Sequence, residues 1–137
     1  MKPLLPLIAL CSFVSTVIAA EVQKVDPAAA AKLVAEGKAV LVDVREPSEW
    51  TESGVAAPAV LLPKSEFDAG LAGGWKDFVA KVGDKQIITY CRSGRRSDAV
   101  AAALAEKGLK VANAGGFKAW QEAGLPVRKA DGPAKQP

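Results

Sequence analysis

A short apolar run, a basic loop and a helical pattern follow one another between residues 86 and 107. Residues 86–90 are typical of a buried strand, and residues 98–107 repeat their apolar side chains at the spacing of a helix. The loop between them reads Cys91-Arg92-Ser93-Gly94-Arg95-Arg96-Ser97. In open sheets of parallel strands, ligands bind in the loops after the carboxyl ends of the strands. We therefore expect this loop to be the functional site.

Several features of the loop favour the thiolate form of Cys91. The first turn of the following helix has about four backbone N–H groups without partners in the helix, and it carries the positive end of the helix dipole. Gly94 can adopt backbone conformations that let successive N–H groups converge on one point. The side chains of Arg92, Arg95 and Arg96 add positive charge. Such surroundings lower the pKa of a thiol from about 8.5 toward or below neutrality, so we expect a thiolate at neutral pH.

Residues 1–20 have the pattern of a secretory signal peptide. Lys2 gives a positively charged start, residues 4–18 are mostly apolar, and small residues at 19 and 20 mark a cleavage site. The stretch is short for a membrane span, and Leu10 is larger than the residue that precedes the cysteine of a lipoprotein signal. We expect an exported, periplasmic protein with no stable membrane span after cleavage. An uncleaved anchor is the alternative.

The cysteine count also indicates chemistry at Cys91. The chain has two cysteines, and Cys11 would leave with the signal peptide, so no internal disulfide could form in the mature protein. Exported proteins usually use cysteines in pairs, because their compartment is oxidising. The alternative is a buried cysteine that acts as a small apolar residue. The arginines and the glycine around Cys91 favour a reactive thiol instead.

Strand and helix patterns alternate along the remaining chain. Strands are expected near residues 21–25, 39–42, 59–63, 86–90 and 109–112, and helices near residues 28–36, 47–52, 64–68, 75–82 and 98–107, with a further short helix that turns Phe117 and Trp120 inward. Ser97 is the expected N-cap of the helix after the loop. This order predicts an α/β domain over residues 21–128, a doubly wound five-stranded parallel sheet with helices on both faces. Residues 129–137 are expected to be a disordered tail.

Two charged residues follow the apolar run at residues 39–42. Asp43 and Arg45 are placed at the carboxyl end of a parallel strand, the edge that holds ligand sites in such sheets. We expect their side chains to support the loop by hydrogen bonds. The alternative is that they only cap and solvate the end of the strand.

Because the other basic residues are scattered along the sequence, we expect no nucleic-acid surface.

Three separated blocks of this sequence share a pattern with a known family. They are residues 41–46 with Glu49 and Trp50, residues 91–96, and Gly115-Gly116-Phe117 with Trp120 and residues 124–127. Together they resemble the single-domain rhodanese-like sulfurtransferases over almost the whole expected mature chain. The resemblance implies that Cys91 takes a sulfane sulfur from a donor such as thiosulfate as a persulfide and passes it to cyanide or a thiol. It implies no metal and no organic cofactor.

The resemblance also implies roles for the loop residues. Thiosulfate is a dianion, which Arg92, Arg95 and Arg96 would attract and orient. The Cys91 thiolate would attack its outer sulfur, with sulfite leaving, and the N–H groups of residues 92–96 would hold the persulfide sulfur. The chain departs from the family at residues 54–59, which read Gly-Val-Ala-Ala-Pro-Ala where many members have Gly-His-Ile-Pro-Gly-Ala, and it has no histidine.

Two other functions remain open from the sequence. Phosphatases and arsenate reductases that share the fold have one residue more between the cysteine and the arginine, whereas here four residues separate Cys91 from Arg96. This shorter loop favours sulfur over a tetrahedral oxyanion. The second alternative is a non-enzymatic binding or sulfur-relay module that works only with a partner. The sequence leaves the oligomeric state undetermined.

Overall fold

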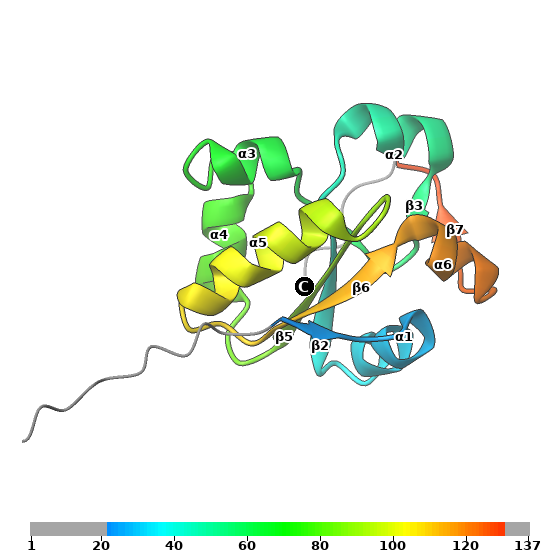
Figure 1. Ribbon diagram of the computed structural model, residues 1–137, viewed down its shortest axis with the longest axis horizontal. Helices are drawn as coiled ribbons and strands as arrows, with labels where there is room; N and C mark the ends of the chain where they lie inside the picture. Colours follow the sequence, from blue (N-terminus) through cyan, green and yellow to red (C-terminus); the bar gives the residue numbers. More distant parts are fainter. Residues whose placement is uncertain (1–21, 131–137) are drawn as a thin grey trace, which may run out of the picture.

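A computed structural model describes residues 22–130, which are organised around a five-stranded parallel sheet (Figure 1). The strand order is β1-β6-β5-β2-β4, and every neighbouring pair is parallel. The strands are β1 (Gln23–Lys24), β2 (Ala39–Asp43), β4 (Val60–Leu61), β5 (Gln86–Cys91) and β6 (Val111–Gly116). The helices are α1 (Pro27–Ala35), α2 (Pro47–Ser53), α3 (Lys64–Asp68), α4 (Trp75–Lys81), α5 (Arg95–Glu106) and α6 (Phe117–Glu122). The predicted doubly wound parallel sheet is confirmed.

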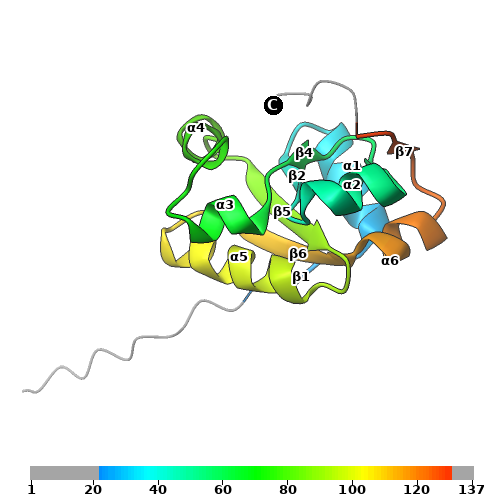
Figure 2. The same cartoon turned by 90° about the horizontal axis from the view of Figure 1, so that it is seen from above.

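Helices cover both faces of the sheet, with α4 and α5 on one side and α1 and α6 on the other (Figures 1 and 2). Side chains of the central strands alternate between the two cores, since successive residues of a strand point to opposite faces. In β2, Val40 and Val42 pack with the α4 and α5 side, whereas Leu41 packs with the α1 and α6 side. In β5, Cys91 belongs to the first of these cores. The sulfur therefore lies on the face that α5 covers.

The start of α5 differs from the prediction. The helix begins at Arg95, and its N-cap is Gly94, whose φ of 92° lies in the left-handed region. The predicted N-cap at Ser97 is wrong, because the glycine turns the chain into the helix three residues earlier. Ser97 instead occupies the first turn of α5 and is completely buried.

The strand after α5 also differs from the prediction. It was expected at residues 109–112, but β6 runs from Val111 to Gly116 and ends beside Cys91, with an irregularity in its register to β5. Its last four residues are one asparagine, one alanine and two glycines, which have low intrinsic strand preference. Pairing with β5 and burial between helices determine the strand here, and neither is visible in the local sequence.

A second, two-stranded sheet was not predicted. It pairs β3 (Val55–Ala56) with β7 (Val127–Arg128) in antiparallel orientation. This pairing brings the end of the domain against the segment that follows α2. The predicted signal peptide at residues 1–20 and residues 131–137 of the predicted tail lie outside the described residues. Between residues 22 and 130, no helix has the length and apolar character needed to cross a membrane.

Candidate active site

Cys91 is the last residue of β5, and the chain folds over its sulfur before α5 begins. The side chain is completely buried, and the backbone N–H of Gly94 donates to Sγ at 3.0 Å. Gly94 is required at this position for two reasons. Its φ is positive, and a Cβ at this position would lie 3.1 Å from Cα of Gly115 in the neighbouring strand. The close approach of the two glycines allows the loop to close over the thiol.

The environment of Cys91 lowers the pKa of its thiol below the ordinary value. Burial is the largest single influence and raises this pKa, because it disfavours the charged form. Hydrogen bonds from the Ser97 side chain and from the backbone N–H groups of Ser97, Gly94 and Ser93 outweigh it. Hydrogen-bond donors at fixed positions are therefore the main groups that favour the thiolate, ahead of the arginine side chains that the sequence suggested.

The three arginines of the loop have different surroundings. Arg96 donates two hydrogen bonds of 2.7 Å to the carboxylate of Glu49 on α2. This hydrogen bonding is the main reason why the pKa of Glu49 falls to about 2, although burial of the carboxylate opposes the shift. Arg92 and Arg95 are exposed, and their side chains form no ion pair within residues 22–130. Of the three arginines of the loop, these two carry a charge that no acidic side chain of residues 22–130 matches.

Asp43 and Arg45 form a buried ion pair beside the same sheet edge, with Arg45 Nη2 2.7 Å from Asp43 Oδ2. Arg45 also donates to Ser53 Oγ at 2.7 Å and to the Gly54 carbonyl at 2.8 Å. Within the described chain, none of the hydrogen bonds of this pair reaches residues 92–96. The predicted hydrogen bonds to the loop are thus corrected, because the Arg45 guanidinium extends toward the end of α2.

The pair contacts α2, the helix whose Glu49 binds Arg96 of the loop. Arg45 holds the last residue of the helix and the glycine after it, and its guanidinium also lies 4.4 Å from the ring centroid of Phe117. The same helix carries Glu49, whose carboxylate both binds Arg96 and accepts from the Glu46 N–H at 2.9 Å. Arg45 therefore holds the carboxyl end of α2, and Glu49 links the same helix to Arg96 of the loop.

Sequence reasoning gave Glu49 and Asn113 no role in the site, and it gave Ser97, at the end of the loop, only the role of a helix cap. Asn113 lies in β6 and is only 5% exposed. Its Nδ2 donates to the Gly94 carbonyl at 2.9 Å, and its Oδ1 accepts from Ser97 Oγ at 2.8 Å and from the Gly115 N–H at 2.9 Å. A polar residue inside a buried strand was the available signal for Asn113. Its neighbours become evident only once β6 is placed beside β5.

Two hollows lie at opposite edges of the sheet. A hollow of about 460 Å³ adjoins the loop and is lined by Ser93, Gly94 and Arg95 together with Lys24. A larger hollow, of about 790 Å³, lies at the amino-terminal edge, away from Cys91. Among residues 22–130, no group of three or more histidine, cysteine or acidic side chains is arranged to hold a metal ion.

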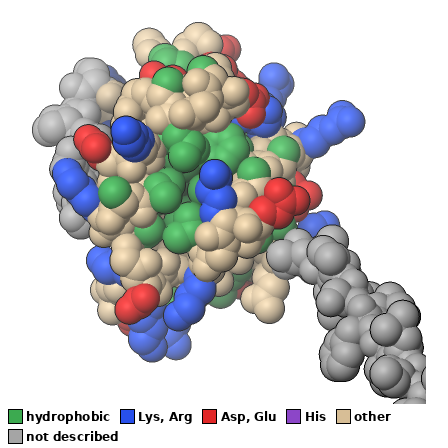
Figure 3. Space-filling model, turned by 90° about the vertical axis from the view of Figure 1, so that its left-hand side faces the viewer, with side chains coloured by type: hydrophobic (Ala, Val, Ile, Leu, Met, Phe, Trp, Pro, Cys, Tyr) green, Lys and Arg blue, Asp and Glu red, His purple; other side chains and the backbone are tan. Residues whose placement is uncertain are grey.

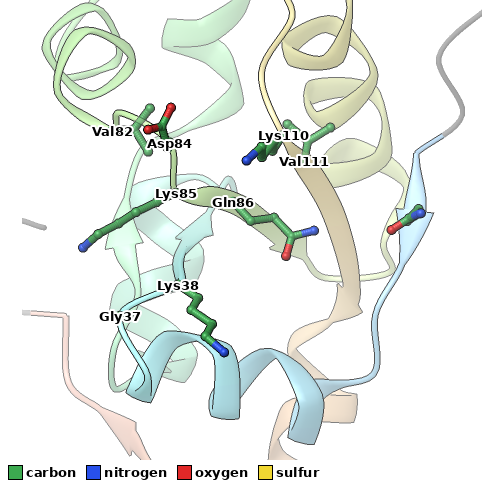
Figure 4. A pocket seen from close by; sticks show the side chains of 9 residues that line it. Gly37, Lys38, Val82, Asp84, Lys85, Gln86, Lys110 and Val111 are labelled. Atoms are coloured by element: carbon green, nitrogen blue, oxygen red, sulfur yellow. The ribbon is translucent and has the colours of Figure 1, made fainter.

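The larger hollow has a basic rim. Lys38, Lys85 and Lys110 extend from three separate segments around Gln86 (Figure 4). The side of the molecule at the left of Figure 1 shows apolar side chains at its centre, with basic and acidic side chains around them (Figure 3). The fold thus gathers lysines that are scattered in the sequence, which composition alone did not predict.

Comparison with known proteins agrees with this geometry. Residues 26–123 match the model of the rhodanese-like domain. The chain belongs to the rhodanese-like family. It is 34% identical over 95 residues to a sulfurtransferase of Allochromatium vinosum, and this match covers 68% of this chain and 81% of that protein. It is 33% identical over 113 residues to the thiosulfate sulfurtransferase GlpE of Actinobacillus succinogenes, which covers 80% of this chain and 93% of that protein.

Solved structures share the fold. A protein of unknown function from Rhodopseudomonas palustris, described as a possible tyrosine phosphatase, is 28% identical with a TM-score of 0.64. The match covers 78% of this rhodanese-like chain and 85% of that one. The family and its named relatives therefore support sulfur transfer as the general activity.

Proposed function

We propose that this protein is a thiosulfate-type sulfurtransferase that carries a sulfane sulfur on Cys91 as a persulfide. One observation carries the proposal: the buried Cys91 sulfur lies under a loop whose Gly94 N–H reaches it at 3.0 Å. Such a loop can stabilise a thiolate before the sulfur is taken up and an anionic sulfur afterwards. The loop with four residues between Cys91 and Arg96 supports this function over phosphate-ester hydrolysis.

The proposed reaction has two steps. The Cys91 thiolate attacks the outer sulfur of thiosulfate, the sulfur–sulfur bond of the donor breaks, and sulfite leaves with the electron pair. Cyanide or a thiolate then attacks the outer sulfur of the persulfide, and the electron pair of the broken bond returns to Cys91. Arg92 and Arg95 supply the attraction for the dianion, because the charge of Arg96 is already matched by Glu49.

Turnover of the isolated protein with thiosulfate and cyanide tests this function. We expect thiocyanate to form with the wild-type protein and not with Cys91→Ser, because a hydroxyl cannot carry the transferred sulfur. Hydrolysis of a phosphate ester without thiocyanate formation would support a phosphatase instead. Neither activity in a folded protein would support a relay module that needs a partner.

We also propose that the protein is exported to the periplasm, on the pattern of residues 1–20. The expected result is a protein in the periplasmic fraction whose mass corresponds to a start near residue 21. A full-length protein in the cytoplasmic fraction would contradict export.

A further inference from the structure

The orientation of the Asn113 side-chain amide follows from its two backbone partners. Its Nδ2 donates to the Gly94 carbonyl and its Oδ1 accepts from the Gly115 N–H, both at 2.9 Å. The reversed orientation would set two donors against each other at Gly115 and two acceptors against each other at Gly94. Oδ1 therefore faces Ser97 as an acceptor, at 2.8 Å from its Oγ.

The Ser97 hydroxyl has two acceptors within reach but only one proton to donate. Besides Asn113 Oδ1, its Oγ lies 3.4 Å from Sγ of Cys91. Ser97 is completely buried, so water does not compete for this proton. A thiolate is the stronger acceptor of the two, because it carries a full negative charge, whereas a neutral sulfur is a weak acceptor.

We propose that the Ser97 hydroxyl follows the charge on Cys91, donating to the sulfur while it is a thiolate and to the Asn113 carbonyl while it is neutral. Rotation about the Cβ–Oγ bond is enough to exchange the two partners. Asn113 is then a positioning residue, since it holds the hydroxyl next to the sulfur in the neutral state. Sγ is neutral in the persulfide as well, because the negative charge then lies on the outer sulfur, so this part of the inference rests on the proposed function.

The exchange affects the two half-reactions in opposite ways. When the persulfide is discharged, the sulfur–sulfur bond breaks and its electron pair returns to Sγ, so a hydroxyl that turns toward Sγ stabilises the leaving thiolate. When the persulfide forms, the same hydrogen bond must be given up, and a thiolate without it is the stronger nucleophile. If the hydroxyl acted only on the fold, its removal would slow both steps together.

The pH dependence of Cys91 alkylation tests the first part of the proposal without any sulfur donor. We expect Ser97→Ala to raise the midpoint by about one pH unit, so that alkylation below the midpoint slows about tenfold. Ser97→Thr retains a hydroxyl and should restore the wild-type midpoint. Thr89→Val is the matched control, because it removes a buried hydroxyl that donates to the Ser97 carbonyl at 3.0 Å rather than to the sulfur. An unchanged midpoint in Ser97→Ala, or an equal shift in Thr89→Val, would overturn the proposal.

The Asn113 end of the exchange is tested by the amide resonance of Gly115, which shares Oδ1 with the Ser97 hydroxyl. We expect this resonance to shift with the same midpoint as the alkylation, and with a smaller amplitude in Ser97→Ala. A resonance that does not respond in the wild-type protein would contradict the exchange.

Single-turnover measurements test the opposite effects on the half-reactions. Above the midpoint, Ser97→Ala should discharge its persulfide to cyanide more slowly than the wild-type protein, while its loading by thiosulfate is not slowed. Equal slowing of both steps would contradict the proposal. If the wild-type protein forms no persulfide, the proposed function fails, whereas the alkylation and resonance measurements still decide the exchange.

Discussion

The two edges of the sheet differ in how they present positive charge. The amino-terminal edge has the larger hollow, with Lys38, Lys85 and Lys110 on its rim, and Lys38 lies 2.9 Å from Glu36. Its lysines are exposed and partly paired, so solvent and salt weaken their field. The carboxyl-terminal edge has a smaller hollow, but donors at fixed positions converge there on Cys91. The comparison teaches that buried, oriented N–H and O–H groups favour the thiolate of Cys91, whereas the larger hollow with its lysines has no such group of donors around a thiol.

The largest effect is expected from Gly116→Ala, at the carboxyl-terminal edge. A Cβ on Gly116 would lie 2.3 Å from the backbone carbonyl oxygen of Arg92, so the loop must move. We expect Cys91 to lose its donors and sulfur transfer to fall to the background rate. Gly37→Ala is the matched control at the other edge, since nothing lies within 4 Å of its added Cβ. Its φ of +72° gives it a cost of about 1 kcal/mol in unfolding free energy with transfer unchanged. Equal transfer rates in the two variants would break the comparison.

A smaller effect is expected from Glu49→Gln. The substitution removes the charge that fixes Arg96 through two hydrogen bonds of 2.7 Å, while the side chain keeps its shape. We expect the unfolding free energy to fall by about 1 kcal/mol and sulfur transfer to slow several-fold, because the loop is less firmly held. Denaturant unfolding and thiocyanate formation measure the two effects. A variant as active and as stable as the wild-type protein would show that the ion pair is incidental to the site.

The same ion pair gives a pH dependence with a defined sign. The pKa of Glu49 falls to about 2 in the folded protein, below the value of about 4.3 for an unfolded glutamate. A lowered carboxyl pKa adds stability above the unfolded pKa, and this stability is lost as the pH falls toward the folded pKa. The difference in unfolding free energy between the wild-type protein and Glu49→Gln should therefore shrink between about pH 5 and pH 2. A difference that stays constant over this range would contradict the assignment.

The smallest effect is expected from the amino-terminal edge, where Lys38, Lys85 and Lys110 are all replaced by glutamine. This change should leave the alkylation midpoint of Cys91 unchanged and alter transfer only slightly at low salt.

The corresponding change at the carboxyl-terminal edge should have a larger effect. Replacing Arg92 and Arg95 with glutamine should raise the KM for thiosulfate and reduce the salt dependence of the rate. Similar losses in the two variants would mean that overall charge, rather than position, attracts the donor.

Local patterns in the sequence were enough to predict the parallel sheet and the position of the loop after β5. Residues 39–42 are a continuous apolar run, residues 86–90 are mostly apolar, and the loop after the second run combines a cysteine, a glycine and three arginines. The contacts of Asn113 and Glu49 could not be predicted, because each joins residues of different elements and depends on strand register or helix orientation. The position of Ser97 was misjudged for a related reason. The conformation of one residue, Gly94, moved the start of α5 and turned an expected cap into a buried donor.

The pairing of β3 with β7 shows the same limit in the fold. Each strand has two residues, too few for any periodic pattern, and the partners lie at distant points of the chain. Arg45 was correctly placed at the sheet edge, but its side chain was expected to extend toward the loop and instead extends toward the end of α2. Its bonds to Ser53 and Gly54 became visible only with the position of α2.

The intact mass of the protein after incubation with thiosulfate and desalting tests the central claim most directly. The account predicts a gain of one sulfur atom, which is lost on addition of cyanide and is absent from Cys91→Ser. No gain in a folded protein whose Cys91 still reacts with an alkylating agent would contradict it.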